Sequence, residues 1–120
     1  MRYLWVGLGG AAGSILRYAI GLNVDQSHFP WATLGINITG SFVLAFIVTY
    51  ATARHWSLDV STAITVGFVG SYTTFSTFMW ESFVLGRTDR AGVAAVYVGV
   101  SIAFGLLAAW GGYRLAQSFT

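Results

Sequence analysis

The residues best suited to chemistry lie in one stretch, Gly67 to Phe78, which combines glycines, hydroxyl side chains and phenylalanines in an uncharged segment. Five serines and threonines fall between positions 71 and 77, and their hydroxyl groups can donate hydrogen bonds. Phe75 and Phe78 are three residues apart and so share a helical face, and the edge of each ring is weakly positive. Hydroxyl groups and ring edges together suit a small anion.

The same stretch predicts a break in a membrane helix. Residues 60–80 carry no formal charge, and about 20 apolar residues suffice to cross a bilayer as a helix. Two glycines, Gly67 and Gly70, weaken the helix, and the hydroxyl side chains after them offer the backbone competing hydrogen bonds. We therefore expect a break near Gly70–Thr74. Unwound backbone inside a membrane must be buried in protein or line a polar cavity, where its free carbonyls can hold an ion.

The composition indicates an integral membrane protein. Hydrophobic residues make up 56% of the chain and charged residues only 8%, whereas a soluble domain carries about 25%. The absence of cysteine excludes disulfides and thiolate metal sites. The six arginines are scattered, which gives no clustered basic face for nucleic acid. His28 and His55 fall in different loops on opposite sides, and so do Asp25 and Asp59. Neither a metal cluster nor a catalytic triad is therefore expected, and we predict no enzymatic activity.

Four hydrophobic segments must position the central stretch, and they cover about residues 3–22, 30–53, 58–86 and 90–115. Because only short connections separate them, we expect residues 1–120 to form a single all-α domain of four transmembrane helices, multi-pass in the cell (inner or plasma) membrane. The first segment has a basic start and small residues, as signal peptides do. Its apolar character continues past Arg17, which favours a retained helix.

The arginines are evenly divided between the two sides of such a protein. One side would hold Arg2, Arg54 and Arg114, and the other Arg17, Arg87 and Arg90. The positive-inside rule orients a protein through an imbalance, so either a weak bias is sufficient or the chain inserts in both orientations and pairs with an inverted copy of itself. Four helices cannot both enclose a polar path and shield it from the lipid bilayer. This favours an antiparallel, dual-topology homodimer.

Two further helices carry polar stripes at four-residue spacing. The stripes are Thr33, Asn37 and Ser41 in the second segment, and Tyr97, Ser101 and Gly105 in the fourth. An amide within the membrane is costly unless it has a partner, so Asn37 either binds helices together or belongs to a polar path. The other polar residues on its face favour the path. Together with the hydroxyl groups of the third segment, the two stripes predict one polar track.

Several other residues have a packing interpretation. Gly9 and Gly13 allow two helices to approach closely, and we expect them to serve packing. Glu81 is the only acidic residue well away from a loop, and we interpret it as a partnered residue near the membrane interface rather than a coupling or gating group. Arg17 either extends to lipid headgroups or caps a water-filled vestibule, where it would raise the local concentration of anions.

Three stretches resemble the signature motifs of the Fluc (CrcB) family of fluoride channels. They are residues 13–18 (GSILRY), 33–42 (TLGINITGSF) and 67–78 (GFVGSYTTFSTF). The motifs occur in the family's order and spacing, and the third is the most specific. The resemblance implies a dual-topology antiparallel homodimer with two parallel fluoride pores. It also implies passive fluoride export, which lowers cytoplasmic fluoride and protects the cell.

The resemblance also assigns roles to individual residues. Phe75 and Phe78 would line the fluoride positions, and Asn37 would contribute a donor. A structural sodium ion would lie on the dimer axis, held by backbone carbonyls at Gly70 and Thr73. Hydroxyl groups would continue the fluoride pathway, and Arg17 would lie at the vestibule. The hydroxyl residues are Thr33, Ser76, Thr77, Tyr97 and Ser101. Gly105 departs from the pattern at a position where serine is expected, and its role stays open.

Two other functions remain open. Small proton-coupled exporters of the dual-topology four-helix type have a similar length, but they need a membrane-embedded carboxylate, usually early in the chain. The first segment has none, and Glu81 is the only candidate. The other possibility is a subunit that transports nothing by itself. The residues alone indicate a small anion, and only the resemblance names fluoride.

Overall fold

The computed structural model describes residues 1–120, which form helices joined by short connections, with no β-strand. The predicted all-α class is therefore confirmed. The elements are α1 (Arg2–Asn23), α2 (Trp31–Ala53), α3 (Leu58–Thr62), the π-helix η1 (Ala63–Val69), α4 (Gly70–Tyr72), α5 (Ser76–Arg87) and α6 (Ala91–Ser118). Both α2 and α6 are long and apolar enough to cross a bilayer, as expected of a membrane protein.

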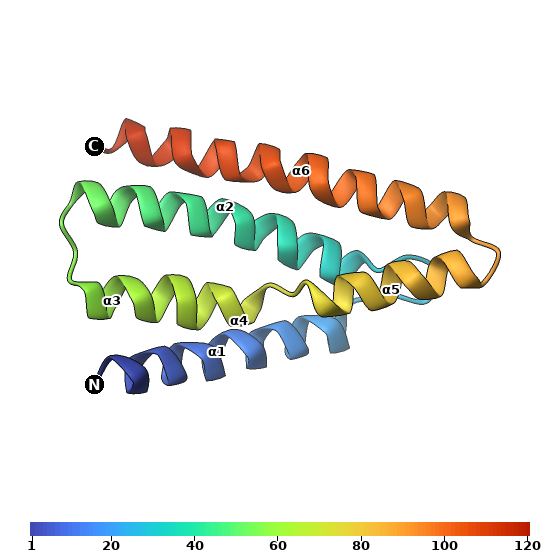
Figure 1. Cartoon of the computed structure of the whole chain (residues 1–120), viewed down its shortest axis with the longest axis horizontal. Helices are drawn as coiled ribbons and strands as arrows, with labels where there is room; N and C mark the ends of the chain where they lie inside the picture. Colours follow the sequence, from blue (N-terminus) through green and yellow to red (C-terminus); the bar gives the residue numbers. More distant parts are fainter.

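The molecule is an elongated bundle of 50 × 30 × 20 Å (Figure 1). Both termini and the α2–α3 connection lie at one end, and the α1–α2 and α5–α6 connections lie at the other (Figure 1). The helices therefore alternate in direction along the long axis.

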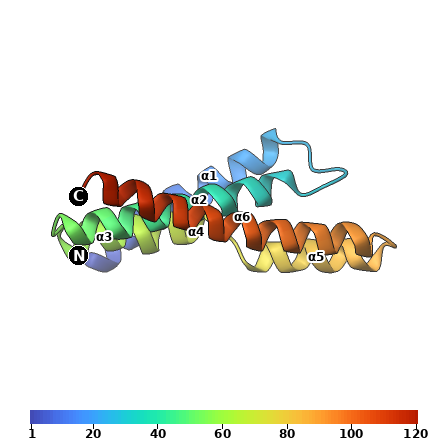
Figure 2. The same ribbon diagram turned by 90° about the horizontal axis from the view of Figure 1, so that it is seen from above.

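The predicted break in the third hydrophobic segment is present, but it begins later than expected. Gly70 does not end the helix, because its N–H donates to the carbonyl of Thr65 and Gly70–Tyr72 remain helical. The chain unwinds at Thr73, which adopts an extended conformation (φ −80°, ψ 160°), and becomes helical again at Ser76. The two halves of the broken helix have different neighbours. The half before the break runs along α1, whereas α5 lies beside α6 (Figure 2).

A close approach between α1 and η1 fixes the half before the break. A Cβ atom added to Gly13 would lie 3.0 Å from both the carbonyl carbon of Phe68 and the nitrogen of Tyr72, and one added to Gly67 would lie 2.6 Å from the carbonyl oxygen of Val6. A Cβ on Gly9 would likewise meet the backbone of Ala63. The packing prediction for Gly9 and Gly13 is thus confirmed. The π-helical hydrogen bonding of η1 had no signal in the sequence.

The half after the break is anchored by the main apolar cluster. Leu34 of α2, Phe78 and Leu85 of α5, and Tyr97 of α6 form this cluster, and Tyr97 is fully buried. The α2 and α6 helices also pack along one another over most of their length. The second polar stripe therefore begins at the centre of the core, where α5 meets α6.

Candidate functional site

One open cavity lies at the break and brings together five of the predicted site residues. It has a volume of about 270 Å³, and we call it the break cavity. Its lining residues are Asn37, Gly40, Ser41, Leu44, Val69, Gly70, Thr73, Thr74, Phe75 and Phe78. Side chains of α2 thus face the unwound backbone and the first turn of α5. Amide, hydroxyl, ring-edge and carbonyl groups all surround this one space.

Asn37 is paired with the unwound backbone. Its side-chain Nδ2 donates to the carbonyl oxygen of Thr74, and the N–H of Thr74 donates to its Oδ1, each at 2.9 Å. Asn37 therefore holds two helices together, as one of the two interpretations predicted, and it also lines the break cavity. An amide nitrogen carries two hydrogens, and the bond to Thr74 uses only one of them.

The two phenylalanines have different surroundings, although they are three residues apart. Phe75 lies just before α5 and is 73% exposed, whereas Phe78 is 8% exposed. Their rings meet edge to face with centroids 6.5 Å apart, and Phe78 makes a second such contact with Tyr97 at 5.1 Å. The expectation of one common face is therefore corrected. Phe78 belongs to the core, and Phe75 presents its ring at the molecular surface.

The break also leaves a carbonyl without its helical partner. In a continuous helix the N–H of Thr74 would donate to the carbonyl of Gly70, but here it donates to Asn37. The N–H and Oγ1 of Thr73 both donate to the carbonyl of Val69 at 3.0 Å. Gly70 and Thr73 both line the break cavity. Backbone oxygens are hard ligands, and they suit a hard cation.

A second cavity adjoins the break on the side of the α1–α2 connection. This arginine cavity has a volume of about 290 Å³ and is lined by Arg17, Tyr18, Gly21, Leu22, Gln26, Ala32, Thr33, Ile36, Thr74, Thr77 and Glu81. The Nε of Arg17 donates to the carbonyl oxygen of Ser71 at 3.1 Å. Arg17 therefore turns toward the break rather than outward to lipid headgroups, and it lines a cavity. Thr74 lines both this cavity and the break cavity.

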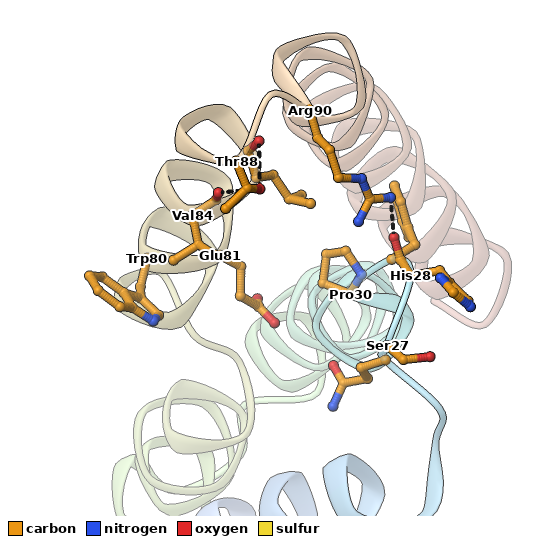
Figure 3. A pocket seen from close by; sticks show the side chains of 11 residues that line it. Ser27, His28, Pro30, Trp80, Glu81, Val84, Thr88 and Arg90 are labelled. Carbon is orange, nitrogen blue, oxygen red and sulfur yellow. Dashed lines mark hydrogen bonds between the residues drawn. The ribbon is translucent and has the colours of Figure 1, made fainter.

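A third cavity, the loop cavity, lies between the α1–α2 connection and α5 and has a volume of about 240 Å³ (Figure 3). Arg90 donates to the carbonyl of His28 across it, and Glu81 extends into it from α5 (Figure 3). Glu81 also lines the arginine cavity and accepts a hydrogen bond from the hydroxyl of Tyr97 at 3.0 Å. The prediction that Glu81 has a partner is therefore confirmed, and the structure adds that its side chain lines two cavities.

The remaining predicted residues are not all on one continuous path. Thr33 and Thr77 meet in the arginine cavity, and Tyr97 reaches Glu81 from the core. Ser76, in contrast, is exposed and lines none of the three cavities. The Oγ of Ser101 is buried and has no hydrogen-bond partner, although a helical serine usually bonds the carbonyl four residues back. The single polar track is therefore divided within one chain.

Comparison with known proteins gives the same family as the motifs. Residues 4–113 match the family model described as CrcB-like protein, Camphor Resistance (CrcB). The chain is 48% identical to the fluoride-specific ion channel FluC 2 of Geobacillus kaustophilus, over 98% of this chain and 94% of that protein. It is 42% identical to the fluoride-specific ion channel FluC of Acidobacterium capsulatum, over 92% and 91%. It is 38% identical to the fluoride-specific ion channel FluC of Ignicoccus hospitalis, over 95% of this chain and 94% of that protein. This chain belongs to the CrcB-like family.

Proposed function

We propose that this protein is a fluoride-selective ion channel that exports fluoride passively, lowers cytoplasmic fluoride and so protects the cell. One observation carries the proposal: two phenylalanine rings, an amide and an unwound backbone surround a single cavity at the break. The relatives' names identify fluoride as their ion. The proposed location is the cell (inner or plasma) membrane.

The anion would be bound by weak donors in the break cavity. The ring edges of Phe75 and Phe78 carry partial positive charge, and the second hydrogen of the Asn37 amide is free to donate. A small, hard anion fits between ring edges, whereas a larger one would have to separate the rings. This arrangement therefore favours fluoride over chloride.

Hydroxyl groups would extend the path on either side of the break cavity. Thr33 and Thr77 line the arginine cavity, and we assign Ser76, Tyr97 and Ser101 to the remainder of the track. Arg17 would attract anions into the arginine cavity, which would serve as the vestibule of the pathway. Because salt screens such attraction, Arg17→Gln should reduce fluoride efflux more at low ionic strength than at high ionic strength. An equal reduction at both salt concentrations would contradict the vestibule role.

The proposed assembly is an antiparallel homodimer of one four-helix transmembrane domain. The four spans would be α1, α2, the broken helix running from α3 to α5, and α6. Phe75 is largely exposed and the break cavity opens on the surface, so a single chain would leave its pathway facing lipid. An inverted copy would cover it, and the balanced arginines permit both orientations.

We further propose that a structural sodium ion lies on the axis of this dimer. The carbonyls of Gly70 and Thr73 would hold it, and the freed carbonyl of Gly70 fits such a ligand. One chain supplies only these two positions, and an inverted partner would double them. The ion would neutralise carbonyl dipoles that otherwise face one another across the axis.

The decisive experiment is fluoride efflux from liposomes that contain the purified protein, read with a fluoride electrode. Valinomycin clamps the potassium gradient, sodium is present throughout, and a chloride electrode provides the control. We expect rapid efflux of fluoride but not of chloride, without a pH gradient. No efflux at all, or equal efflux of both anions, would contradict the proposal.

A proton-coupled exporter is the second candidate, because Glu81 lies between the loop cavity and the arginine cavity and is hydrogen bonded to Tyr97. Such a transporter requires a carboxylate that gains and loses a proton. Glu81→Gln should abolish transport by an exporter, whereas a channel should keep passive flux. Efflux that requires a proton gradient in the wild type would favour the exporter.

A further inference from the structure

One unwound residue, Thr74, has both its backbone N–H and its backbone carbonyl bonded to a side chain of another helix. Both the N–H and the carbonyl of Thr74 bond to the amide of Asn37, each at 2.9 Å. The neighbouring N–H of Phe75 has no hydrogen bond. The bilayer interior supplies no water to hydrogen bond unwound backbone. A pair of hydrogen bonds from a neighbouring side chain therefore decides which residue can leave the helix.

The flanking bonds transmit this anchorage to both halves of the broken helix. The Oγ1 of Thr74 accepts from the N–H of Thr77 at 3.2 Å and so caps the start of α5. On the other side, Thr73 donates twice to Val69 and closes the last turn of α4. Fixing Thr74 therefore fixes the direction of α5, and Phe75 is the next residue in the chain.

The α2 helix lies close enough for a short side chain to reach the break. A Cβ atom added to Gly40 would collide with the Cγ2 of Thr73 and lie 3.4 Å from the Cδ2 of Tyr72. Asn37 lies one turn earlier on the same helix, and its side chain reaches the backbone of Thr74. The hydroxyl of Ser41 donates to the backbone carbonyl of Asn37 at 2.7 Å.

We propose that Asn37 is a positioning residue whose amide locks the backbone of Thr74. This lock keeps the break unwound, orients Phe75 and maintains the partition between the break cavity and the arginine cavity. Thr74 lines both cavities, so the paired groups lie where the two spaces meet. The inference deepens the proposed function and rests on it for the flux measurement below, but not for the structural one.

The structural test uses the unmodified protein in lipid nanodiscs and amide hydrogen exchange measured by NMR. One net hydrogen bond corresponds to about a fivefold change in an opening equilibrium, so two bonds to one residue predict about 25-fold slower exchange for Thr74 than for Phe75. Equal exchange at the two amides would overturn the lock. This measurement needs no variant and so cannot be lost to misfolding.

The second test compares Asn37→Leu with Asn23→Leu, since Asn23 is exposed and donates only to Ala19 of its own helix. Asn37→Leu should speed Thr74 exchange by about 25-fold and reduce fluoride efflux, whereas Asn23→Leu should change neither. Lost efflux with Thr74 still protected would make Asn37 a direct donor only and would overturn the lock. A protected Thr74 in a wild-type protein without fluoride efflux would instead refute the proposed function and leave the lock in place.

Discussion

Replacing Gly13 with alanine should separate α1 from the first half of the broken helix. The added Cβ would lie 3.0 Å from the carbonyl carbon of Phe68 and from the nitrogen of Tyr72, and both are backbone atoms that cannot rotate away. Gly7 of the same helix provides a matched control, because a Cβ added there meets nothing within 4 Å. The two variants make the same chemical change in the same helix and differ only in the room available.

The magnitude follows from two opposing terms. Replacing a helix-interior glycine with alanine stabilises a helix by about 1 kcal/mol, and this gain is common to both variants. Overpacking costs about 1–3 kcal/mol, and it applies only to Gly13→Ala. We therefore expect Gly7→Ala to be about 1 kcal/mol more stable than the wild type. Gly13→Ala should be about 1–3 kcal/mol less stable than Gly7→Ala.

The assay is reversible unfolding in mixed micelles with increasing SDS, followed by far-UV circular dichroism. Fluoride efflux should fall in Gly13→Ala as well, because Arg17 lies one turn further along α1 and would be drawn away from the carbonyl of Ser71. If Gly13→Ala proves as stable as Gly7→Ala, α1 does not pack against η1 as closely as the structure indicates.

Three other predictions can be checked independently. Phe75→Ile and Phe78→Ile should each abolish fluoride efflux. Phe78→Ile should also destabilise the protein more than Phe75→Ile, because it loses two edge-to-face contacts of about 0.5–1.5 kcal/mol each, whereas Phe75→Ile loses one. Full efflux in both variants would refute binding of the anion by ring edges. Gly105→Ser should leave the melting temperature unchanged or slightly higher, since its Cβ would lie 3.9 Å from the Oγ of Ser41, and a clear loss of stability would contradict the open space seen there. The backbone and side-chain hydrogen bonds from Ser27 lower the pKa of Asp25 below its ordinary value of 3.8. These bonds should therefore stabilise the α1–α2 connection above pH 3.8, and this stabilisation should be lost as the pH falls through the lowered pKa. An NMR titration of Asp25 with a midpoint at or above 3.8 would contradict this.

The helices were predictable because their signal is local. A long uncharged hydrophobic run predicts a transmembrane helix without any knowledge of its neighbours. The expected segments 3–22, 30–53 and 90–115 correspond to α1, α2 and α6 to within a few residues. The break was predictable in kind, since glycine and hydroxyl residues weaken a helix wherever they occur. Its position was predicted to within a few residues, although Thr73 rather than Gly70 begins the unwound residues.

The candidate site was predicted as a set of residues but not as a geometry. Spacing placed Phe75 and Phe78 on one face, yet one ring is exposed and the other belongs to the core, because the chain becomes helical only after Phe75. Spacing also left Arg17 with two destinations. Its bond to the carbonyl of Ser71 decided between them, and that carbonyl is 54 residues away in the sequence.

The sequence by itself determined that this is a helical membrane protein of the CrcB-like family, that a helix breaks in its third hydrophobic segment, and which side chains could bind an anion. Residue type and local spacing carry that information, because transfer into lipid and helical propensity act on neighbouring residues. Only the tertiary structure decided where the break lies, which cavity each side chain lines and which polar atoms are already bonded. Those outcomes depend on how far Asn37 can reach from α2 and how closely Gly13 lets α1 approach η1, and such distances between helices are fixed only when the whole bundle has packed.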